Sequence, residues 1–220
     1  MTPLQKWTVS LVTTAIAVAV SFLWLDIPIA TFAHNATAHT RLYSDLTLLP
    51  EPLVPMGLLA LFALGLWALA GQPLSRPLQV GLLCCVSLII TEAVKRELKY
   101  IFGRTWPETW IKGNPSLMHD GVYGFNFFHG GQGYASFPSG HTAAVCAVVS
   151  VLWICYPRFR VLYAAAVAAV TIGLIGADYH FLSDVIAGGF VGTTIGWFAL
   201  LLYGELTKPS SAKQPIGFLH

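Results

Sequence analysis

Six long apolar stretches, separated by polar or glycine-rich segments, set the pattern of the chain. A helix needs about 20 mostly apolar residues to cross a bilayer, and each stretch approaches or reaches that length. The stretches cover residues 8–25, 53–70, 78 to beyond 90, 138–156, 161–177 and 181–203. This pattern predicts an all-α fold, a bundle of six transmembrane helices that forms a single domain over residues 1–220.

The segments between these stretches differ in length and composition. Residues 71–77 and 157–160 contain proline and arginine, which predicts tight turns. Residues 26–51 are polar and are expected to form a loop outside the membrane. Residues 103–137 are rich in glycine and aromatic residues and lack helical periodicity, and the polar tail over residues 208–220 is expected to be flexible.

The first apolar stretch could belong to a signal peptide or to a retained helix. Ala36-Thr37-Ala38 offers a weak cleavage-like pattern after it. The stretch is longer than the ~7–15 residues of a signal-peptide core, however, and it is long enough for a tilted span. We therefore expect a retained transmembrane helix.

Composition supports a membrane protein. Hydrophobic residues make up 55% of the chain and charged residues only 10%, and the mean hydropathy is +0.67. Soluble domains carry about 25% charged residues. The net charge of +2 and the lack of a basic tract argue against a nucleic-acid partner. The four cysteines, all in apolar stretches, predict buried thiols rather than disulfides or a metal site.

Six spans place both chain ends on one side of the membrane, and the cations do not decide which side is cytoplasmic. The side with the termini would hold Lys6, Arg76, Arg158, Arg160, Lys208 and Lys213. The other side would hold Arg41, Lys95, Arg96, Lys99, Arg104 and Lys112. Most of the cations in the second group cluster around a candidate site, so their presence on that side can be explained by function. We therefore expect cytoplasmic termini and an extracytoplasmic site in a bacterial inner membrane.

The start of the fourth apolar stretch carries the first candidate for chemistry, Phe137-Pro138-Ser139-Gly140-His141-Thr142. The serine is placed to cap the helix. Helix N-termini present unpaired backbone N–H groups and a partial positive charge, which suit anions. The segment indicates an anion site with an ionisable imidazole beside it.

A second candidate lies at the start of the sixth stretch, where His180 and Asp184 are one helical turn apart. A carboxylate at that spacing can accept an imidazole N–H, fix its tautomer and raise its basicity. Gly188, Gly192 and Gly196 continue the same face and predict close packing against another helix. That packing would bring the His180 end against a neighbouring span.

Two histidines at one membrane face favour phosphoryl chemistry. One of the two imidazoles, His141 or His180, can attack phosphorus while the other protonates the leaving oxygen. Lys99 shares a helical face with Glu92, Lys95 and Arg96 at the end of the third stretch. Its ammonium and the backbone N–H groups near Ser139 and Gly140 could neutralise phosphoryl oxygens, a composition that requires no metal and no cofactor.

These residues resemble the type 2 phosphatidic acid phosphatase superfamily of membrane lipid phosphatases. Its pattern comprises Lys, six residues and Arg-Pro; Pro-Ser-Gly-His; and Ser-Arg, five residues, His, three residues and Asp. The second part is complete at Pro138–His141, and the third ends at His180 and Asp184. The first part places Lys99 at the lysine and Pro107 at the proline, so the resemblance covers about residues 95–189.

The resemblance implies a role for each matched residue. His180 would be the nucleophile that forms a phosphohistidine, Asp184 would orient it, and His141 would protonate the leaving group. Lys99, Ser139 and Gly140 would hold the phosphate. The implied activity is metal-independent hydrolysis of a lipid phosphate or lipid diphosphate at the bilayer.

Two arginines of the family pattern are replaced, by Trp106 and by Leu174, which follows Gly173. Neither replacement can imitate a bidentate arginine–phosphate pair. Arg104 lies two residues before Trp106, so in an extended segment it points to the same side and is expected to substitute. For the second arginine the candidates are His129, Arg96 and Lys95, whereas Asp178 would repel phosphate unless a cation pairs with it.

Several alternatives remain open at the level of sequence. The same histidines could serve a phosphoryl or headgroup transferase with a lipid acceptor, or catalysis could be lost, although the intact His141, His180 and Asp184 favour activity. A serine hydrolase would need Gly-x-Ser-Gly around Ser139, but position 137 is phenylalanine. A transporter would need polar groups at mid-depth. His119 and His129 lack the spacing of a zinc site, and the aromatic segment 121–131 is either an interfacial belt or a lid.

Overall fold

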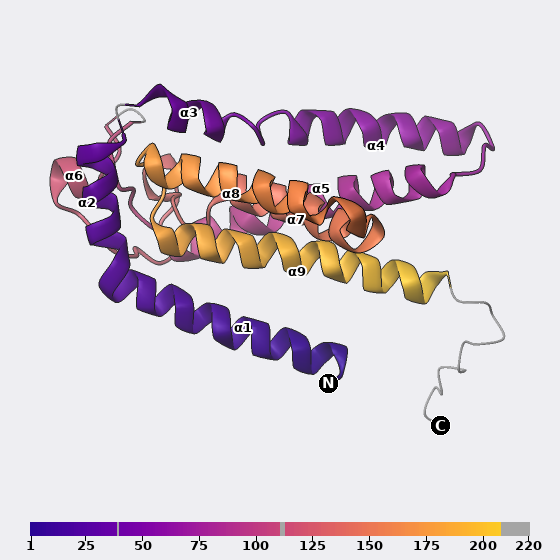
Figure 1. Cartoon of the computed structure of the whole chain (residues 1–220), viewed down its shortest axis with the longest axis horizontal. Helices are drawn as coiled ribbons and strands as arrows, with labels where there is room; N and C mark the ends of the chain where they lie inside the picture. Colours follow the sequence, from indigo (N-terminus) through magenta and orange to yellow (C-terminus); the bar gives the residue numbers. More distant parts are fainter. Residues whose placement is uncertain (39, 111–112, 208–220) are drawn as a thin grey trace.

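The computed structural model describes residues 1–38, 40–110 and 113–207, and this part of the chain is helical with isolated β-bridges only (Figure 1). The long helices are α1 (Pro3–Val20), α2 (Asp26–Ala36), α4 (Leu53–Leu69), α5 (Arg76–Phe102), α7 (Gly140–Cys155), α8 (Arg160–Gly176) and α9 (Leu182–Leu206). Shorter elements are α3 (Arg41–Thr47), α6 (Leu117–Asp120), a π-helical turn (Ser21–Leu25) and 3-10 turns at Gln132–Tyr134 and Pro157–Phe159.

The helix ends near the site follow from local sequence. Ser139 caps α7, and its Oγ accepts hydrogen bonds from the Thr142 backbone N–H at 3.5 Å and from the Thr142 hydroxyl at 3.2 Å. Helix α5 ends at Gly103, whose φ of 53° lies in the left-handed region that glycine adopts without strain. The loop that crosses the site begins at this glycine.

Helix α9 packs closely against α7 through its glycine stripe, as the sequence predicts. A Cβ atom at Gly188 would collide with the carbonyl of Ser139, and one at Gly192 would collide with the carbonyl of Ala143. Gly196 is equally close to Ser150 and to the carbonyl of Ala147. These contacts place the start of α9, which carries Asp184, directly against the start of α7.

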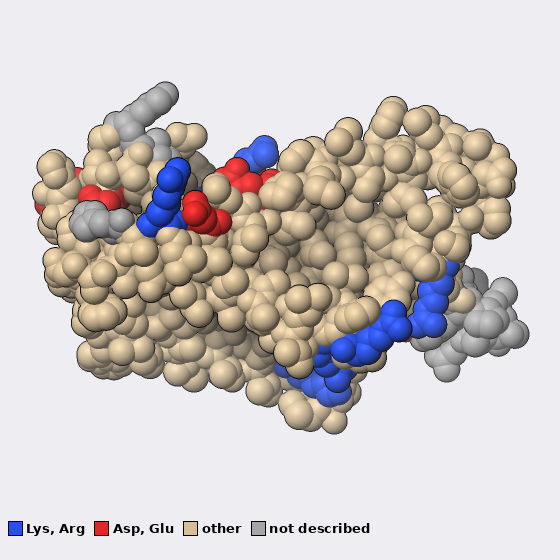
Figure 2. Space-filling view, turned by 45° about the horizontal axis from the view of Figure 1, so that its top comes forward, with Lys and Arg blue, Asp and Glu red and all other residues tan. Residues whose placement is uncertain are grey.

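Four helical segments of the described chain are long and apolar enough to cross a membrane: Pro3–Ala36, Arg76–Phe102, Pro157–Gly176 and Leu182–Leu206. Helices α4 and α7 are also apolar but shorter, with 17 and 16 residues, so the six-span arrangement stays a prediction. On the face in Figure 2, charged side chains gather toward two ends, with a broad uncharged surface between them. Such a band suits the hydrocarbon layer of a bilayer.

The prediction of a polar loop over residues 26–51 is wrong. The first helix continues through the π-helical turn into α2 and reaches Ala36, and α3 follows in the next segment. Buried Asp26, Ala30 and Ala33 recur at helical spacing, so α2 packs one face against the protein. The N-terminus and the end of α9 lie at one end of the bundle, opposite α2 and α6 (Figure 1). The predicted flexible tail lies outside the described residues.

Candidate active site

His180 and Asp184 form the centre of the site, at the junction of α8 and α9. The Nδ1 atom of His180 lies 3.3 Å from Oδ2 of Asp184, and His180 is 5% exposed. His180 precedes α9 rather than lying in its first turn, yet the expected contact forms. The carbonyl of Leu174 fixes the bend, because it accepts hydrogen bonds from the backbone N–H groups of Tyr179 at 3.0 Å and His180 at 3.3 Å.

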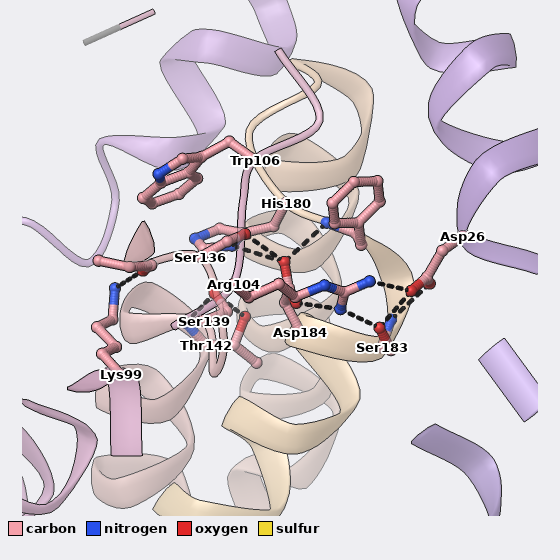
Figure 3. Close-up of polar contacts among 12 residues, drawn as sticks. Asp26, Lys99, Arg104, Trp106, Ser136, Ser139, Thr142, His180, Ser183 and Asp184 are labelled. Carbon is pink, nitrogen blue, oxygen red and sulfur yellow. Dashed lines mark hydrogen bonds and ion pairs between the residues drawn. The ribbon is translucent and has the colours of Figure 1, made fainter. Parts of the chain in front are cut away.

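Asp184 is held by donors on both carboxylate oxygens (Figure 3). Its Oδ2 accepts from the Ser136 hydroxyl at 2.6 Å and from the Phe181 backbone N–H at 3.0 Å, and its Oδ1 accepts from Nη1 of Arg104 at 2.5 Å. An ionised carboxylate only accepts hydrogen bonds, so Nδ1 of His180 carries the proton and Nε2 keeps a free electron pair. Burial lowers the pKa of His180, which favours the neutral imidazole.

The turn before α7 forms a second wall of the site. The Ser139 backbone N–H donates to the Asp184 carbonyl at 3.0 Å, which ties the turn to α9. The Ser139 hydroxyl is occupied with Thr142 at the helix start, which agrees with a capping role rather than that of a nucleophile. A Cβ at Gly140 would lie 3.0 Å from Nζ of Lys95, so the glycine leaves room for that cation.

His141 lies in the first turn of α7, beside an open pocket of about 210 Å³. Its Nε2 is 3.8 Å from Oε1 of Glu51, and the imidazole is close enough to His180 for their charges to interact. The pocket is lined by Pro50, Glu51, Val54, Glu92, Lys95, Gly140, His141 and Ala144. Lys95 forms an ion pair of 2.6 Å with Glu92 there, so the pocket carries both signs of charge.

Lys99 lies on the α5 side of the site. Its Nζ donates one hydrogen bond to the carbonyl of Ala135 at 2.6 Å, and an ammonium has three N–H groups. The same Nζ lies 5.6 Å from the ring centroid of Trp106. Lys99 also interacts electrostatically with Asp184, so its ammonium belongs to the same site as the His180–Asp184 pair.

Trp106 and Leu174, which stand where the resemblance implies arginines, are both buried. The ring of Trp106 lies 5.1 Å from that of His180, and its Nε1 donates to the carbonyl of Gln132 at 2.8 Å. It forms an aromatic wall beside the imidazole. Leu174 packs in an apolar cluster with Val170 and Val185.

The position of Arg104 differs from the one expected for a replacement phosphate ligand. Its side chain is 0% exposed, and it lies between Asp184 and Asp26 rather than beside an open pocket. Burial alone would lower its pKa, but the two carboxylates outweigh that effect, so the pKa is raised and the guanidinium is charged. The extended segment turns the side chain toward the interior, where these carboxylates neutralise it.

Four site residues were missed from the sequence: Asp26, Tyr123, Ser136 and Ser183. For Asp26 a signal was available, since it is the only Asp, Glu, Lys, Arg or His between Lys6 and His34. A single carboxylate in an apolar helix is costly and points to a buried partner. The other three have no distinguishing spacing.

Within the described residues, one group of side chains has the composition of a metal site, namely His34, Glu108 and Asp178. Nδ1 of His34 lies 2.9 Å from Oε2 of Glu108 and 3.2 Å from Oδ2 of Asp178. These are also ordinary distances for hydrogen bonds between the three groups. His119 and His129, weighed as zinc ligands in the sequence, are not in this group.

Known proteins resemble the chain in both structure and sequence. A PAP2-type phosphatidylglycerolphosphate phosphatase from Bacillus subtilis has a similar structure, with a TM-score of 0.63 and 17% identity over 93% of this chain and 98% of that one. A lipid A 1-phosphatase from Rhizobium etli is 31% identical over 56% of this chain and 48% of its own length. A lipid A 1-phosphatase from Rhizobium johnstonii is 35% identical over 41% and 36%.

The extent of these matches differs between the comparisons. The chain spans about half or less of the length of the two rhizobial relatives. The model of the PAP2 superfamily matches residues 80–208, which is more than half of the 220-residue chain and includes Lys99, the Pro138–His141 turn and His180 with Asp184. The chain therefore belongs to the PAP2 superfamily, the family that its motifs resemble.

Proposed function

We propose that the protein is a membrane phosphatase that hydrolyses a lipid phosphate or lipid diphosphate through a phosphohistidine on His180, without a metal ion. The observation that carries this proposal is the contact of His180 Nδ1 with Asp184, 3.3 Å long and reinforced by Ser136 and Phe181. It leaves Nε2 of His180 as an unprotonated nucleophile. The lipid phosphatases among the relatives support a lipid substrate.

In the first step, Nε2 of His180 attacks the phosphorus atom, and the bond from phosphorus to the lipid oxygen breaks. His141 donates a proton to that oxygen, so the lipid leaves as a neutral alcohol, or as a protonated phosphate if the substrate is a diphosphate. The negative charge of bound phosphate favours the protonated form of His141 before this step. Lys99 and the backbone N–H group of Gly140 at the start of α7 stabilise the charge on the phosphoryl oxygens, whereas the N–H of Ser139 is already bonded to the Asp184 carbonyl.

In the second step, water attacks the phosphohistidine and the phosphorus–nitrogen bond breaks. His141, now neutral, takes a proton from the water, so inorganic phosphate is released and both histidines return to their starting forms. A transferase would use a lipid hydroxyl in place of water with the same proton transfers. The two imidazoles, the Lys99 ammonium and the N-terminus of α7 provide the proton transfers and the positive potential in these steps.

We further propose that the site faces the extracytoplasmic side of a bacterial inner membrane, with both termini in the cytoplasm. The end of the bundle opposite the site carries the cations Lys6, Arg76, Arg158 and Arg160, in agreement with the positive-inside rule. The site would then meet lipid substrate in the outer leaflet.

The test measures phosphate release in detergent with a chelator present, from phosphatidylglycerolphosphate, a lipid A 1-phosphate and a polyprenyl diphosphate. We expect release from at least one substrate, its loss in His180→Ala, and wild-type release in the matched variant His119→Ala, whose residue is exposed. No release from any substrate, or equal release by His180→Ala, contradicts the proposal. Transfer of labelled phosphate to a second lipid would identify a transferase.

A further inference from the structure

A buried ion pair between Asp26 and Arg104 lies beside the His180–Asp184 pair (Figure 3). Asp26 begins α2, whereas Arg104 follows α5, so the pair joins the first and third apolar segments beside the start of α9. Both side chains are 0% exposed. Charges are costly to bury, and two carboxylates around one guanidinium leave a net negative charge at this place.

Arg104 has almost no donor capacity left for a phosphate. Nη1 donates to Ser183 Oγ and Asp184 Oδ1, both at 2.5 Å, and Nη2 donates to Asp26 Oδ2 at 2.7 Å and Tyr123 at 3.2 Å. These contacts use four of its five N–H groups. The guanidinium is also surrounded by the aromatic rings of Phe22, Tyr123, Phe125 and Phe181, with ring centroids 4.4 to 5.3 Å from Cζ.

Both carboxylate oxygens of Asp26 also accept hydrogen bonds, from the start of α9 as well as from Arg104. Its Oδ1 accepts from the Ser183 backbone N–H at 3.0 Å, so it caps the N-terminus of α9 from another helix. Its Oδ2 accepts from the Ser183 hydroxyl, from Arg104 and from Tyr123 at 3.1 Å. One carboxylate therefore fixes both the guanidinium and the helix start that carries Asp184.

We propose that Asp26 is a positioning residue of the site, which holds Arg104 on Asp184 and balances its charge, so that Asp184 remains a fully charged acceptor for His180. In this chain Arg104 pairs with Asp26 and Asp184 instead of binding phosphate. The inference rests on the proposed function of His180 as the nucleophile. Without Asp26, the whole charge of Arg104 would fall on Asp184, which would then accept the His180 N–H more weakly.

The charge of Asp26 therefore acts on His180 through Arg104. The charged groups that face His180 are Asp184 on α9, Arg104 in the loop, Lys99 on α5 and His141 on α7. Three of these four groups are cations or can become cations. The protonation of the His180 imidazole therefore depends on how much of the Arg104 charge the carboxylates balance. Removing the negative charge of Asp26 makes protonation of His180 harder and its Nε2 a weaker nucleophile.

The test compares Asp26→Asn, which keeps the size and most hydrogen bonds, with the matched control Asp45→Asn at an exposed carboxylate of α3. We expect Asp26→Asn to lower kcat about tenfold or more with KM within about twofold, and to move the acidic limb of kcat/KM to lower pH. The control is expected to keep wild-type values. A raised KM at unchanged kcat would assign Arg104 to phosphate binding and overturn the proposal.

A second measurement does not depend on turnover. In ¹⁵N-histidine NMR spectra of the full chain in detergent, with His180 assigned by its loss in His180→Ala, we expect Asp26→Asn to lower the titration midpoint of His180. An unchanged midpoint in a folded variant overturns the inference, even if the variant is less stable. Absence of phosphate release by the wild type, together with the expected NMR shift, rejects the proposed function alone.

Discussion

At the scale of single residues, the site depends on what surrounds each carboxylate oxygen of Asp184. Ser136, Phe181 and His180 meet at Oδ2, and Arg104 meets Oδ1. The donors come from a loop, a helix start and the bend before it. Each contributes a hydrogen bond to a charged group, which is stronger than one between neutral groups.

Ser136→Ala tests the contribution of the hydroxyl. A hydrogen bond to a charged group contributes about 1.5–3 kcal/mol, so we expect kcat to fall about tenfold or more while KM changes little. Steady-state phosphate release measures both constants. Ser150→Ala, which removes a hydroxyl bonded to its own helix at Ala147, serves as control. Wild-type kcat in Ser136→Ala would show that the hydroxyl does not orient the pair.

The pH dependence of the reaction follows from the burial of His180. Its pKa is lowered by burial, and the proposed reaction needs a neutral imidazole as the nucleophile. The acidic limb of kcat/KM is therefore expected below the ordinary histidine value of about 6.5, with little loss as the pH falls from 7.5 to 6.5. A pH series with a constant-ionic-strength buffer measures the limb. A limb above pH ~7 would contradict the neutral buried imidazole.

At the scale of elements, the close approach of α9 to α7 and the α8–α9 junction determine where the histidines lie. The glycine stripe brings the backbones together, and the Leu174 carbonyl fixes the bend that carries His180. The sequence predicted the stripe because it follows helical periodicity. The bend has no periodic signal, so the sequence does not predict how His180, which precedes the helix, reaches Asp184.

Gly192→Ala tests the packing of α9 on α7. The added methyl group would meet backbone atoms of Ala143 and Ala147, which cannot move aside as a flexible side chain could. We expect a loss of about 1–3 kcal/mol and a clearly lower Tm in detergent. Gly204→Ala on the same helix has open space at its Cβ and is expected to keep or raise the Tm. Equal Tm values for the two variants would refute the packing argument.

Asp178 at the α8–α9 junction gives a pH-dependent stability. Burial raises its pKa to about 6 in the folded protein, against an ordinary value of 3.8. The folded state therefore binds this proton more tightly than the unfolded state, and the carboxyl costs stability as the pH rises through the window from about 4 to 6. The cost is complete above that window.

Asp178→Asn removes the charge and tolerates the left-handed backbone at this position, where φ is 59°. We subtract the Tm of the wild type from the Tm of this variant, and we expect that difference to be higher at pH 7.5 than at pH 4.5. Thermal unfolding at the two pH values measures the difference, with Glu97→Gln at an exposed position of α5 as control. A difference that is the same at both pH values would contradict the buried carboxyl.

At the scale of the whole molecule, the arrangement has two ends with an apolar band between them. The turn between α4 and α5 lies at the end with the N-terminus, and the loops over the site lie at the other (Figure 1). The face in Figure 2 shows the charged residues at these ends. The topology predicts opposite accessibility for probes placed in the two regions.

Single cysteines introduced by Gln72→Cys and Phe127→Cys, both at exposed positions, test this prediction. In intact bacterial cells with a permeable outer membrane, a membrane-impermeant thiol reagent is expected to label Phe127→Cys, whereas Gln72→Cys requires disruption of the inner membrane. The wild-type chain is the control, because it measures the labelling of the four native cysteines. Labelling in the reverse order would place the site in the cytoplasm.

The sequence by itself determined the apolar helices, the glycine stripe and the residues that match the family motifs, because each depends on spacing within a short segment. The contact of His180 with Asp184 spans four residues, and the cap at Ser139 spans three. Only the tertiary structure showed that Arg104 pairs with Asp184 and with Asp26, which is 78 residues away from it in the chain. Their pairing depends on how α2, the loop after α5 and the start of α9 pack together, and no local periodicity encodes a contact of that kind.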